Sequence, residues 1–167
     1  LNRDILVKNI RGNIDTRIQK LKDGLYDAIV LASAGVKTLK LEKNIKQFFP
    51  IKEMLPAVGQ GIIAVQCRKK DTYIINLLRK IDHKQTRQCA TAERSLLKAI
   101  GGDCDTAVGG LAAIENNELI LYAQLFSDDG ISTFNCKKKG KIEEGLSIGR
   151  LVGADLLKQA GKNFKKN

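Results

Sequence analysis

The 167-residue sequence contains no tryptophan and one histidine, and aromatic residues make up only 5% of it. So few aromatic side chains leave little surface on which nucleobases could stack, and no nucleic-acid-binding motif is visible. The net charge of +11 is high enough to suit a nucleic acid, but the lysines are spread along the chain. We therefore expect no nucleic-acid partner.

The sequence also lacks a long hydrophobic run. No apolar stretch approaches the roughly 18 residues that a membrane-spanning helix needs, and the nearest is the short AIVLA at 28–32. We therefore expect no membrane partner. The hydrophobic fraction of 43% is instead typical of a chain that folds around a packed core.

No Cys-x-x-Cys pair occurs, so the cysteine spacing predicts no metal site. The cysteines are Cys67, Cys89, Cys104 and Cys136. The opening stretch, LNRDILVKNIRGN, has no methionine and no signal-peptide organisation. We therefore expect a fragment of a longer intracellular protein with reduced thiols.

The first fifty or so residues alternate between strand-like and helix-like patterns. DILVKNI (4–10) predicts a strand, and YDAIVLA (26–32) predicts a second one, continuously apolar as in a parallel sheet. Helices are predicted over about 15–24 and 36–49. The order strand, helix, strand, helix is half of an α/β domain, which supports the interpretation as a fragment.

The rest of the chain predicts an α+β domain behind a connecting segment. LPAVGQGIIAVQCR (55–68) indicates a glycine-rich turn feeding a strand, as at a crossing between domains, and a helix follows at 71–81. A helix, three antiparallel strands and a closing helix are then predicted, at 84–100, 107–114, 119–126, 131–137 and 142–161. The basic run CKKKGK (136–141) predicts a solvated hairpin end.

Arg11 and Arg17 lie six residues apart in IRGNIDTR, one in a turn and one in the first turn of the next helix. Backbone N–H groups at a helix N-terminus attract anions, and guanidinium groups bind carboxylates or phosphates through two parallel hydrogen bonds. The pair therefore predicts an anion-binding site. The alternative, two ordinary surface arginines, stays open on these residues alone.

Cys104 is predicted in a turn between a helix and a strand, within AIGGDCDTAVGG (99–110). Asp103 and Asp105 flank it and would raise the pKa of its thiol, which disfavours a turnover nucleophile. The single histidine, His83, offers no evident base for it. An exposed thiol in a glycine-rich turn is suited instead to the covalent attachment of a group.

Upstream of this turn, ERSLLKAIGG places Glu93 next to Arg94 on a helix. In one interpretation the two form a surface ion pair. In the other, Arg94 points toward the anion-binding cleft. The sequence leaves both open.

Four blocks together resemble one known family: RGNIDTR, YDAIVLASAGVKTL, LPAVGQG…QCR and ERSLLKAIGGDC. In this order and spacing they are similar to the C-terminal part of hydroxymethylbilane synthase, also called porphobilinogen deaminase. The resemblance implies a partial periplasmic-binding-protein-like α/β fold, followed by a small α+β domain with a three-stranded antiparallel sheet. It assigns 1–60 to the second α/β domain, 61–82 to a segment returning to the first, and 83–167 to a cofactor-anchoring C-terminal domain.

The same resemblance implies an activity in tetrapyrrole (haem and porphyrin) biosynthesis. The family comprises transferases that join four porphobilinogen molecules head to tail into hydroxymethylbilane and release ammonia. A dipyrromethane cofactor, held by a thioether at the position of Cys104, primes the growing chain. Every pyrrole carries acetate and propionate groups. The resemblance therefore makes Arg11, Arg17 and Arg94 carboxylate binders, and it places Gln60 in a cleft-lining VGQG turn.

The family's catalytic aspartate lies in an N-terminal part that these residues do not match. The resemblance therefore implies no catalytic residue in this fragment, and we expect the 167-residue chain alone to be inactive. The expected partners are porphobilinogen and the growing pyrrole chain, and the full-length protein is expected to be a monomer. Family members work in the cytoplasm or the plastid, and the sequence does not distinguish the two.

Three positions depart from the family pattern. Asp103 stands where a small residue usually precedes the cysteine, and Ala107 replaces a proline. Thr38 replaces an arginine, so that Lys37 or Lys40 would have to take over one carboxylate contact. These departures keep open an alternative function, a non-catalytic polyanion-binding module that retains the fold.

Overall fold

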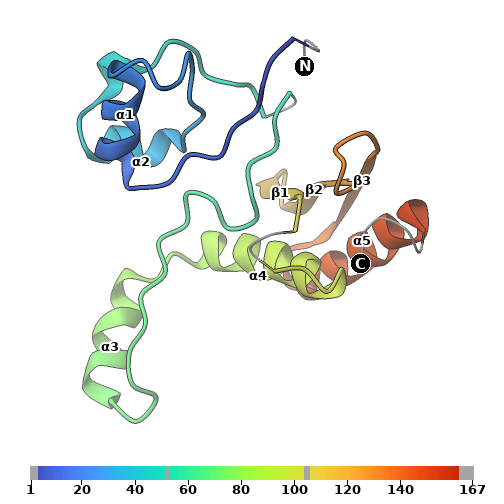
Figure 1. The fold of residues 1–167 in the computed structure, drawn as a ribbon. Helices are drawn as coiled ribbons and strands as arrows, with labels where there is room; N and C mark the ends of the chain where they lie inside the picture. The colour runs from blue at the N-terminus through green and yellow to red at the C-terminus, as the bar shows by residue number, and fades with distance from the viewer. Residues whose placement is uncertain (1–3, 52, 104–105, 162–167) are drawn as a thin grey trace. The chain divides into compact units, whose positions relative to one another are not determined.

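The computed structural model describes residues 4–51, 53–103 and 106–161. The chain divides into two compact units, Leu1–Phe48 and Phe49–Asn167 (Figure 1). The predicted first segment, 1–60, extends past this division, and its assignment to a domain of a larger protein stays a prediction.

The first unit holds helix α1 (Ile14–Lys22), helix α2 (Ser33–Thr38) and the 3-10 turn η1 (Glu42–Asn44). Helix α1 begins where it was predicted because Asn13 caps it, its Oδ1 accepting the backbone N–H of Thr16 at 2.9 Å. Helices α1 and α2 pack closely, since a Cβ added at Gly35 would overlap the side chain of Ile14. Ile18 and Val36 are the buried residues of the two helices.

Three predicted elements of this unit are wrong. The helix predicted over 36–49 begins earlier and ends at Thr38, because Lys40 adopts a positive φ of 56°, outside the helical region. The predicted strands 4–10 and 26–32 form no ladder with any described residue. They are connected by a side chain instead, the Tyr26 hydroxyl donating to the Asn9 carbonyl at 2.9 Å. A strand requires a hydrogen-bonded neighbour, and the described residues provide none for either segment.

The second unit contains the predicted α+β domain. Helices α3 (Thr72–Ile81) and α4 (Lys84–Ala99) precede three strands, and the 3-10 turn η2 (Ile142–Glu144) and helix α5 (Gly145–Ala160) follow them. The strands β1 (Val108–Glu115), β2 (Glu118–Phe126) and β3 (Thr133–Lys141) form an antiparallel sheet in the order β1-β2-β3. The predicted three-stranded antiparallel sheet with helices is therefore confirmed.

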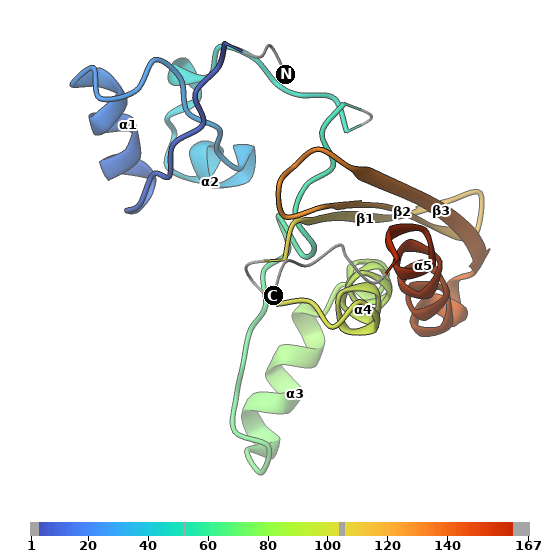
Figure 2. The same cartoon turned by 45° about the vertical axis from the view of Figure 1, so that its right-hand side comes forward.

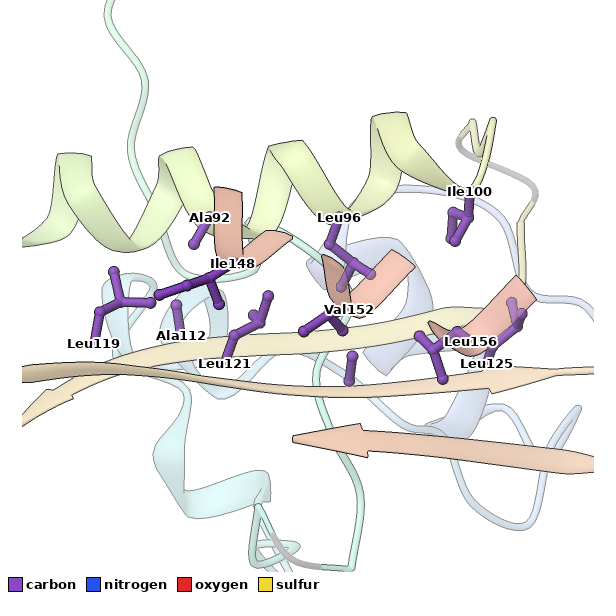
Figure 3. Packing of buried hydrophobic residues seen from close by; sticks show 11 residues of the cluster. Ala92, Leu96, Ile100, Ala112, Leu119, Leu121, Leu125, Ile148, Val152 and Leu156 are labelled. Atoms are coloured by element: carbon purple, nitrogen blue, oxygen red, sulfur yellow. The ribbon is translucent and has the colours of Figure 1, made fainter. Parts of the chain in front are cut away.

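Helices α4 and α5 cover one face of this sheet (Figure 2). Alternate residues of β2 point toward the helices, so Leu119, Leu121 and Leu125 are completely buried. They meet Leu96 of α4 and Val152 of α5 in one apolar layer (Figure 3). This layer fixes the positions of the α4 end and of the β1 start, which together flank Cys104.

Helix α5 lies close to α4 because it presents glycines to it. A Cβ added at Gly149 would lie 2.6 Å from the Cβ of Ser95, and one added at Gly153 would overlap Ala99. The Ser95 hydroxyl donates to the Leu146 carbonyl at 2.7 Å and joins the two helices. None of the helices among the described residues is long and apolar enough to cross a membrane.

The basic run 136–141 lies within β3, so its prediction as a hairpin end is wrong. Its side chains alternate as strand geometry requires, with Cys136 and Lys138 less exposed than their neighbours. Lys138 pairs with Asp155 of α5 at 2.7 Å, and Lys139 pairs with Glu118 of β2 at 2.9 Å. The lysines therefore stabilise the exposed part of the sheet.

Candidate functional site

Two cations of α1 reach back to the turn that precedes the helix. The Nε of Arg17 donates to the Gly12 carbonyl at 2.7 Å, and the Nζ of Lys20 donates to the Arg11 carbonyl at 2.9 Å. Among the described residues, Arg17 uses only Nε, so its terminal nitrogens keep their N–H groups for an anion. The structure thus places positive charge at a helix N-terminus, where the backbone also favours anions.

The turn itself requires glycine. Gly12 has a positive φ of 120°, and a Cβ there would lie 2.9 Å from Cγ2 of Thr16. Arg11 is exposed, and its guanidinium forms no ion pair with the described residues. The prediction that Arg11 lies in a turn and Arg17 at the beginning of the next helix is confirmed in local structure, and their role in binding stays a prediction.

Helix α4 ends in a glycine motif that leads directly to the cysteine turn. Gly101 has a φ of +63° and donates its N–H to Lys98, and Gly102 donates to Leu97 at 2.9 Å. This is the Schellman arrangement, in which glycine takes the left-handed position that other residues avoid. Cys104 itself lies outside the described residues.

The two sides of the cysteine turn are bonded to each other. The backbone N–H of Asp103 donates to the Thr106 hydroxyl at 3.0 Å, and that hydroxyl donates to the Asp103 carboxylate, also at 3.0 Å. Strand β1 begins directly afterwards, and the Ala107 carbonyl accepts the N–H of Phe126 at 3.0 Å. Asp103 therefore contributes its side chain to these bonds, whereas Ala107 contributes only its backbone carbonyl.

The turn that carries Gln60 is attached to the outer edge of β1. Ala57 forms an isolated antiparallel bridge with Gly109, and the Gly110 N–H donates to the Pro56 carbonyl at 2.9 Å. Gln60 is exposed and lines an open hollow of about 320 Å³. His83, Cys89 and Glu93 line the same hollow, with other residues of α4 and β1.

Glu93 of α4 is buried, with only 3% of its surface exposed. Its carboxylate accepts the N–H of Gly59 at 2.7 Å and the N–H of Ala112 at 2.9 Å. Burial raises the pKa of Glu93 above its ordinary value, and the two backbone N–H groups oppose that rise. Arg94 is exposed and forms no ion pair with the described residues, so the interpretation of Glu93 and Arg94 as a surface ion pair is wrong.

Sequence reasoning missed this function of Glu93. One signal was present, because Glu93 occurs four residues after Cys89 and three before Leu96, on the helix face that is otherwise apolar. Burial also raises the pKa of the Cys89 thiol, with a further contribution from the charge of Glu93. His83 caps α4 by accepting the N–H of Thr86 at 3.3 Å, as expected for an ordinary residue at a helix end.

The other candidate positions are occupied by local interactions. The Thr38 hydroxyl donates to the Ala34 carbonyl within α2 at 2.9 Å. The Lys37 ammonium lies 5.5 Å from the centre of the Phe48 ring. Among the described residues, no group of three or more His, Cys, Asp or Glu side chains could hold a metal ion.

Comparison with known protein families decides which family this arrangement belongs to. Residues 1–76 match the family model "Porphobilinogen deaminase, dipyromethane cofactor binding domain", and residues 87–158 match "Porphobilinogen deaminase, C-terminal domain". The chain belongs to the porphobilinogen deaminase family. The two matches cover both structural units and follow each other along the chain.

Individual porphobilinogen deaminases are similar over most of the chain. The protein of Coxiella burnetii is 45% identical over 158 residues, which are 95% of this chain and 52% of the relative. The protein of Brevibacillus brevis is 41% identical over 157 residues (93% and 50%), and that of Roseiflexus castenholzii is 40% identical over 162 residues (97% and 53%). The chain therefore spans about half the length of these deaminases.

The candidate residues are distributed over both deaminase models. Arg11, Arg17 and Gln60 fall in the match to the cofactor-binding model, and Arg94 and Cys104 fall in the match to the C-terminal model. Each structural unit thus contributes at least one arginine to the set predicted from sequence.

Proposed function

We propose that the full-length deaminase containing this chain converts four porphobilinogen molecules to hydroxymethylbilane and releases ammonia. The observation that carries the proposal is the ordered match of both deaminase family models to one chain. Because the chain spans about half the length of its relatives, the activity belongs to the full-length protein. We propose that the 167-residue chain alone is inactive.

The cofactor in this proposal is a dipyrromethane attached to Cys104. Attachment forms a bond between Sγ and a pyrrole methylene carbon, and ammonia leaves that carbon while the thiol loses its proton. When bound, the dipyrromethane supplies the pyrrole end to which further units are joined. Cys104 serves as an anchor, so it needs access to an electrophile more than it needs a low pKa.

The described donors fit a molecule with many carboxylates. Arg11, in the turn before α1, and Arg17 and Lys20, on α1, provide guanidinium and ammonium groups in the first unit. We propose that they and Arg94 bind acetate and propionate groups, and that Gln60 lines the binding cleft. The exposure of Arg94 on α4 and the absence of an ion pair to it among the described residues support that role.

We propose the domain organisation that the resemblance implies: residues 1–60 belong to a second periplasmic-binding-protein-like domain, 61–82 to a segment returning to the first, and 83–167 to the C-terminal domain. The exposed apolar side chains of helix α3 support the assignment of 61–82 to another domain. Its side chains Tyr73, Leu77 and Ile81 follow each other at four-residue spacing, and they are 70%, 41% and 71% exposed.

The segments 4–10 and 26–32 support the same organisation. Their apolar side chains include Leu6, 76% exposed, and Val30, 61% exposed. Exposed apolar side chains of this kind are stabilised when other residues cover them. We propose that residues of the full-length protein outside this chain cover these two segments.

The partners in this proposal are porphobilinogen and the growing pyrrole chain. We propose that the full-length protein is an intracellular monomer, in the cytoplasm or a plastid, without a nucleic-acid or membrane partner. The monomeric state and the compartment rest on the family resemblance, and the absence of nucleic-acid and membrane partners rests on the composition of the sequence.

An intact-mass measurement of the full-length protein tests the proposed function. The mass should exceed that of the polypeptide by two joined pyrroles, localised to the peptide that contains Cys104. Cys104→Ser should abolish this increment, whereas Cys67→Ser, Cys89→Ser and Cys136→Ser should retain it. An unmodified wild-type thiol in protein that binds porphobilinogen would favour the polyanion-binding module instead.

A further inference from the structure

Glu93 is an acidic side chain in the interior of the second unit, where the buried neighbours on its helix include Ala92 and Leu96. Burying a carboxylate is costly unless hydrogen bonds compensate for the lost water. Here each oxygen accepts one backbone N–H, Oε2 from Gly59 and Oε1 from Ala112. These donors lie 34 and 19 residues from Glu93 in the sequence, so the carboxylate joins three separate segments.

The geometry of the sheet edge explains why a carboxylate is used. Strand β1 is at the edge of the sheet, and every second N–H along it points away from β2. The outward N–H of Val108 donates to the Thr106 carbonyl at 2.8 Å, and the next one, at Gly110, donates to Pro56 in the connecting segment. That segment then turns away, with Gly59 at a φ of +76°. The next outward N–H, at Ala112, would lack a backbone partner, and Glu93 accepts it while also holding Gly59.

The connecting segment approaches β1 closely because two glycines open the strand surface. A Cβ added at Gly109 would lie 2.9 Å from Cβ of Leu55, and one added at Gly110 would lie 3.0 Å from Cγ2 of Val58. The connecting segment therefore packs tightly against Gly109 and Gly110 of β1, and its Gly59 is hydrogen-bonded to Glu93 of α4. Gln60 directly follows Gly59, which donates to Glu93, and the N–H of Gln60 itself donates to the Ala57 carbonyl at 3.0 Å. These two hydrogen bonds fix the backbone at Gln60.

We propose that Glu93 is a positioning residue that fixes the Gln60 turn against the outer edge of β1 at Ala112. The inference rests on the proposed function, in which Cys104 carries the dipyrromethane and Gln60 lines its cleft. Glu93 does not touch substrate in this role. It acts through Gln60, and its effect is on the binding of the carboxylate-bearing pyrroles.

The two carboxylate oxygens of Glu93 both accept hydrogen bonds, so replacement by glutamine tests their role directly. Glutamine has the shape of glutamate but offers one oxygen and one NH₂ group, so it can accept only one of the two N–H groups and presents a donor to the other. Glu93→Gln should therefore release either the Gly59 turn or the edge of β1 while the volume stays the same. Glu143→Gln is the matched control, because Glu143 is exposed on η2.

The first measurement is hydrogen exchange in the full-length deaminase that contains this chain. Glu93→Gln should speed amide exchange in peptides covering 57–62 or Ala112 by about tenfold, the factor that corresponds to the loss of one such bond. Glu143→Gln should leave both unchanged. Wild-type exchange at both places in Glu93→Gln would overturn the proposal. If Glu93→Gln does not fold, Gly109→Ala replaces it, because the added Cβ would displace Leu55 and Pro56, which lead into the same turn, while Glu93 stays intact.

The second measurement distinguishes positioning from general stabilisation. Glu93→Gln should raise the KM for porphobilinogen roughly tenfold with a smaller change in kcat, because a misplaced binding group weakens substrate binding. Gln60→Ala should raise KM similarly, and the double variant should be no worse than either single one. Multiplicative effects in the double variant would overturn the positioning role.

The outcomes separate this inference from the proposed function. A wild-type protein that makes no hydroxymethylbilane would overturn the proposed function. An active wild type whose Glu93→Gln variant keeps the wild-type KM would overturn the positioning role alone.

Discussion

The Thr106 hydroxyl donates to the Asp103 carboxylate at 3.0 Å and accepts the Asp103 N–H at the same distance. The Thr106 N–H also donates to the Asp103 carbonyl at 3.4 Å, so three hydrogen bonds join these two residues. Asp103 is a departure from the family pattern, in which a small residue is usual. In this chain the acidic side chain closes the turn that carries the predicted anchor. The carboxylate at this position therefore has a hydrogen-bond donor in the same turn, the Thr106 hydroxyl.

We expect Thr106→Val to reduce cofactor loading of the full-length protein. Valine keeps the shape of threonine but removes the two hydrogen bonds of the hydroxyl to Asp103, and each such bond contributes about 0.5–1.5 kcal/mol. The ratio of loaded to unloaded protein should fall about threefold to tenfold in intact-mass spectra. Thr133→Val, at an exposed position of β3, is the control. Equal loading of all three proteins would show that the turn does not depend on this contact.

We expect Arg17→Lys to weaken porphobilinogen binding although it retains the positive charge. Lysine cannot present the fork of N–H groups that binds a carboxylate, and it cannot make the Nε bond to the Gly12 carbonyl at the same time. The KM of the full-length protein should rise about tenfold, as for the loss of one charge-assisted bond. Arg150→Lys, exposed on α5, should leave KM unchanged. An unchanged KM in Arg17→Lys would argue for an ordinary surface arginine.

We expect Gly149→Ala to destabilise the second unit. The new Cβ would lie 2.6 Å from Cβ of Ser95 and 2.8 Å from the backbone nitrogen of Leu96, and the backbone of α4 cannot yield locally. Overpacking costs about 1–3 kcal/mol, and the higher helix propensity of alanine offsets up to about 1 kcal/mol of that. Urea unfolding should therefore show a net loss of free energy of unfolding.

Gly145→Ala is the matched control for this prediction. Its Cβ would have no neighbour closer than 3.3 Å, which is near ordinary contact. The free energy of unfolding should stay near the wild-type value. A similar loss of free energy of unfolding in Gly149→Ala and Gly145→Ala would show that the close spacing of α4 and α5 does not depend on Gly149.

We expect the stability contribution of Glu93 to increase as the pH falls. Burial raises the pKa of Glu93 above its ordinary 4.5, so the folded protein holds this proton more tightly than the unfolded chain does. Below the folded pKa, protonation therefore adds free energy of unfolding, until the pH reaches about 4.5. Above the folded pKa the contribution is constant.

The measurement is urea unfolding of the wild type and of Glu93→Gln at about pH 7, 6 and 5. The free energy of unfolding of the wild type, relative to the variant, should rise toward the lower pH because glutamine does not titrate. Glu143→Gln should track the wild type throughout. A relative decrease toward pH 5 would mean that the two backbone N–H bonds outweigh burial and lower the pKa.

Local signals in the sequence predicted much of the fold. Asn13 caps α1 and Gly101 and Gly102 end α4, because capping side chains and left-handed glycines act within a few residues. Asn116 and Asn117 both take positive φ values, of 50° and 60°, and close the predicted turn between β1 and β2. The turn at Cys104 was predicted from the same glycines, and Cys104 lies outside the described residues.

Other features depended on residues far away in the sequence. The lysines of 136–141 hide the alternation of β3, and their ion pairs to Glu118 and Asp155 cross to other elements. Segments 4–10 and 26–32 carry strand-like patterns, but pairing needs neighbours that the described residues do not provide. Hydrophobic periodicity predicts which side chains of a segment are buried, but it does not identify the strand with which the segment pairs.

The sequence by itself determined the family, the three-stranded sheet with its helices, and the turn and helix start at Arg11 and Arg17. The four sequence blocks were specific enough to indicate the family. Turn and capping residues, which act over a short range, were enough to predict the elements of the sheet domain and the beginning of α1. Only the tertiary structure decided that Glu93 faces inward, away from Arg94, and joins Gly59 to Ala112. The reason is physical: a carboxylate can be buried only where folding brings two backbone donors to it from distant parts of the chain.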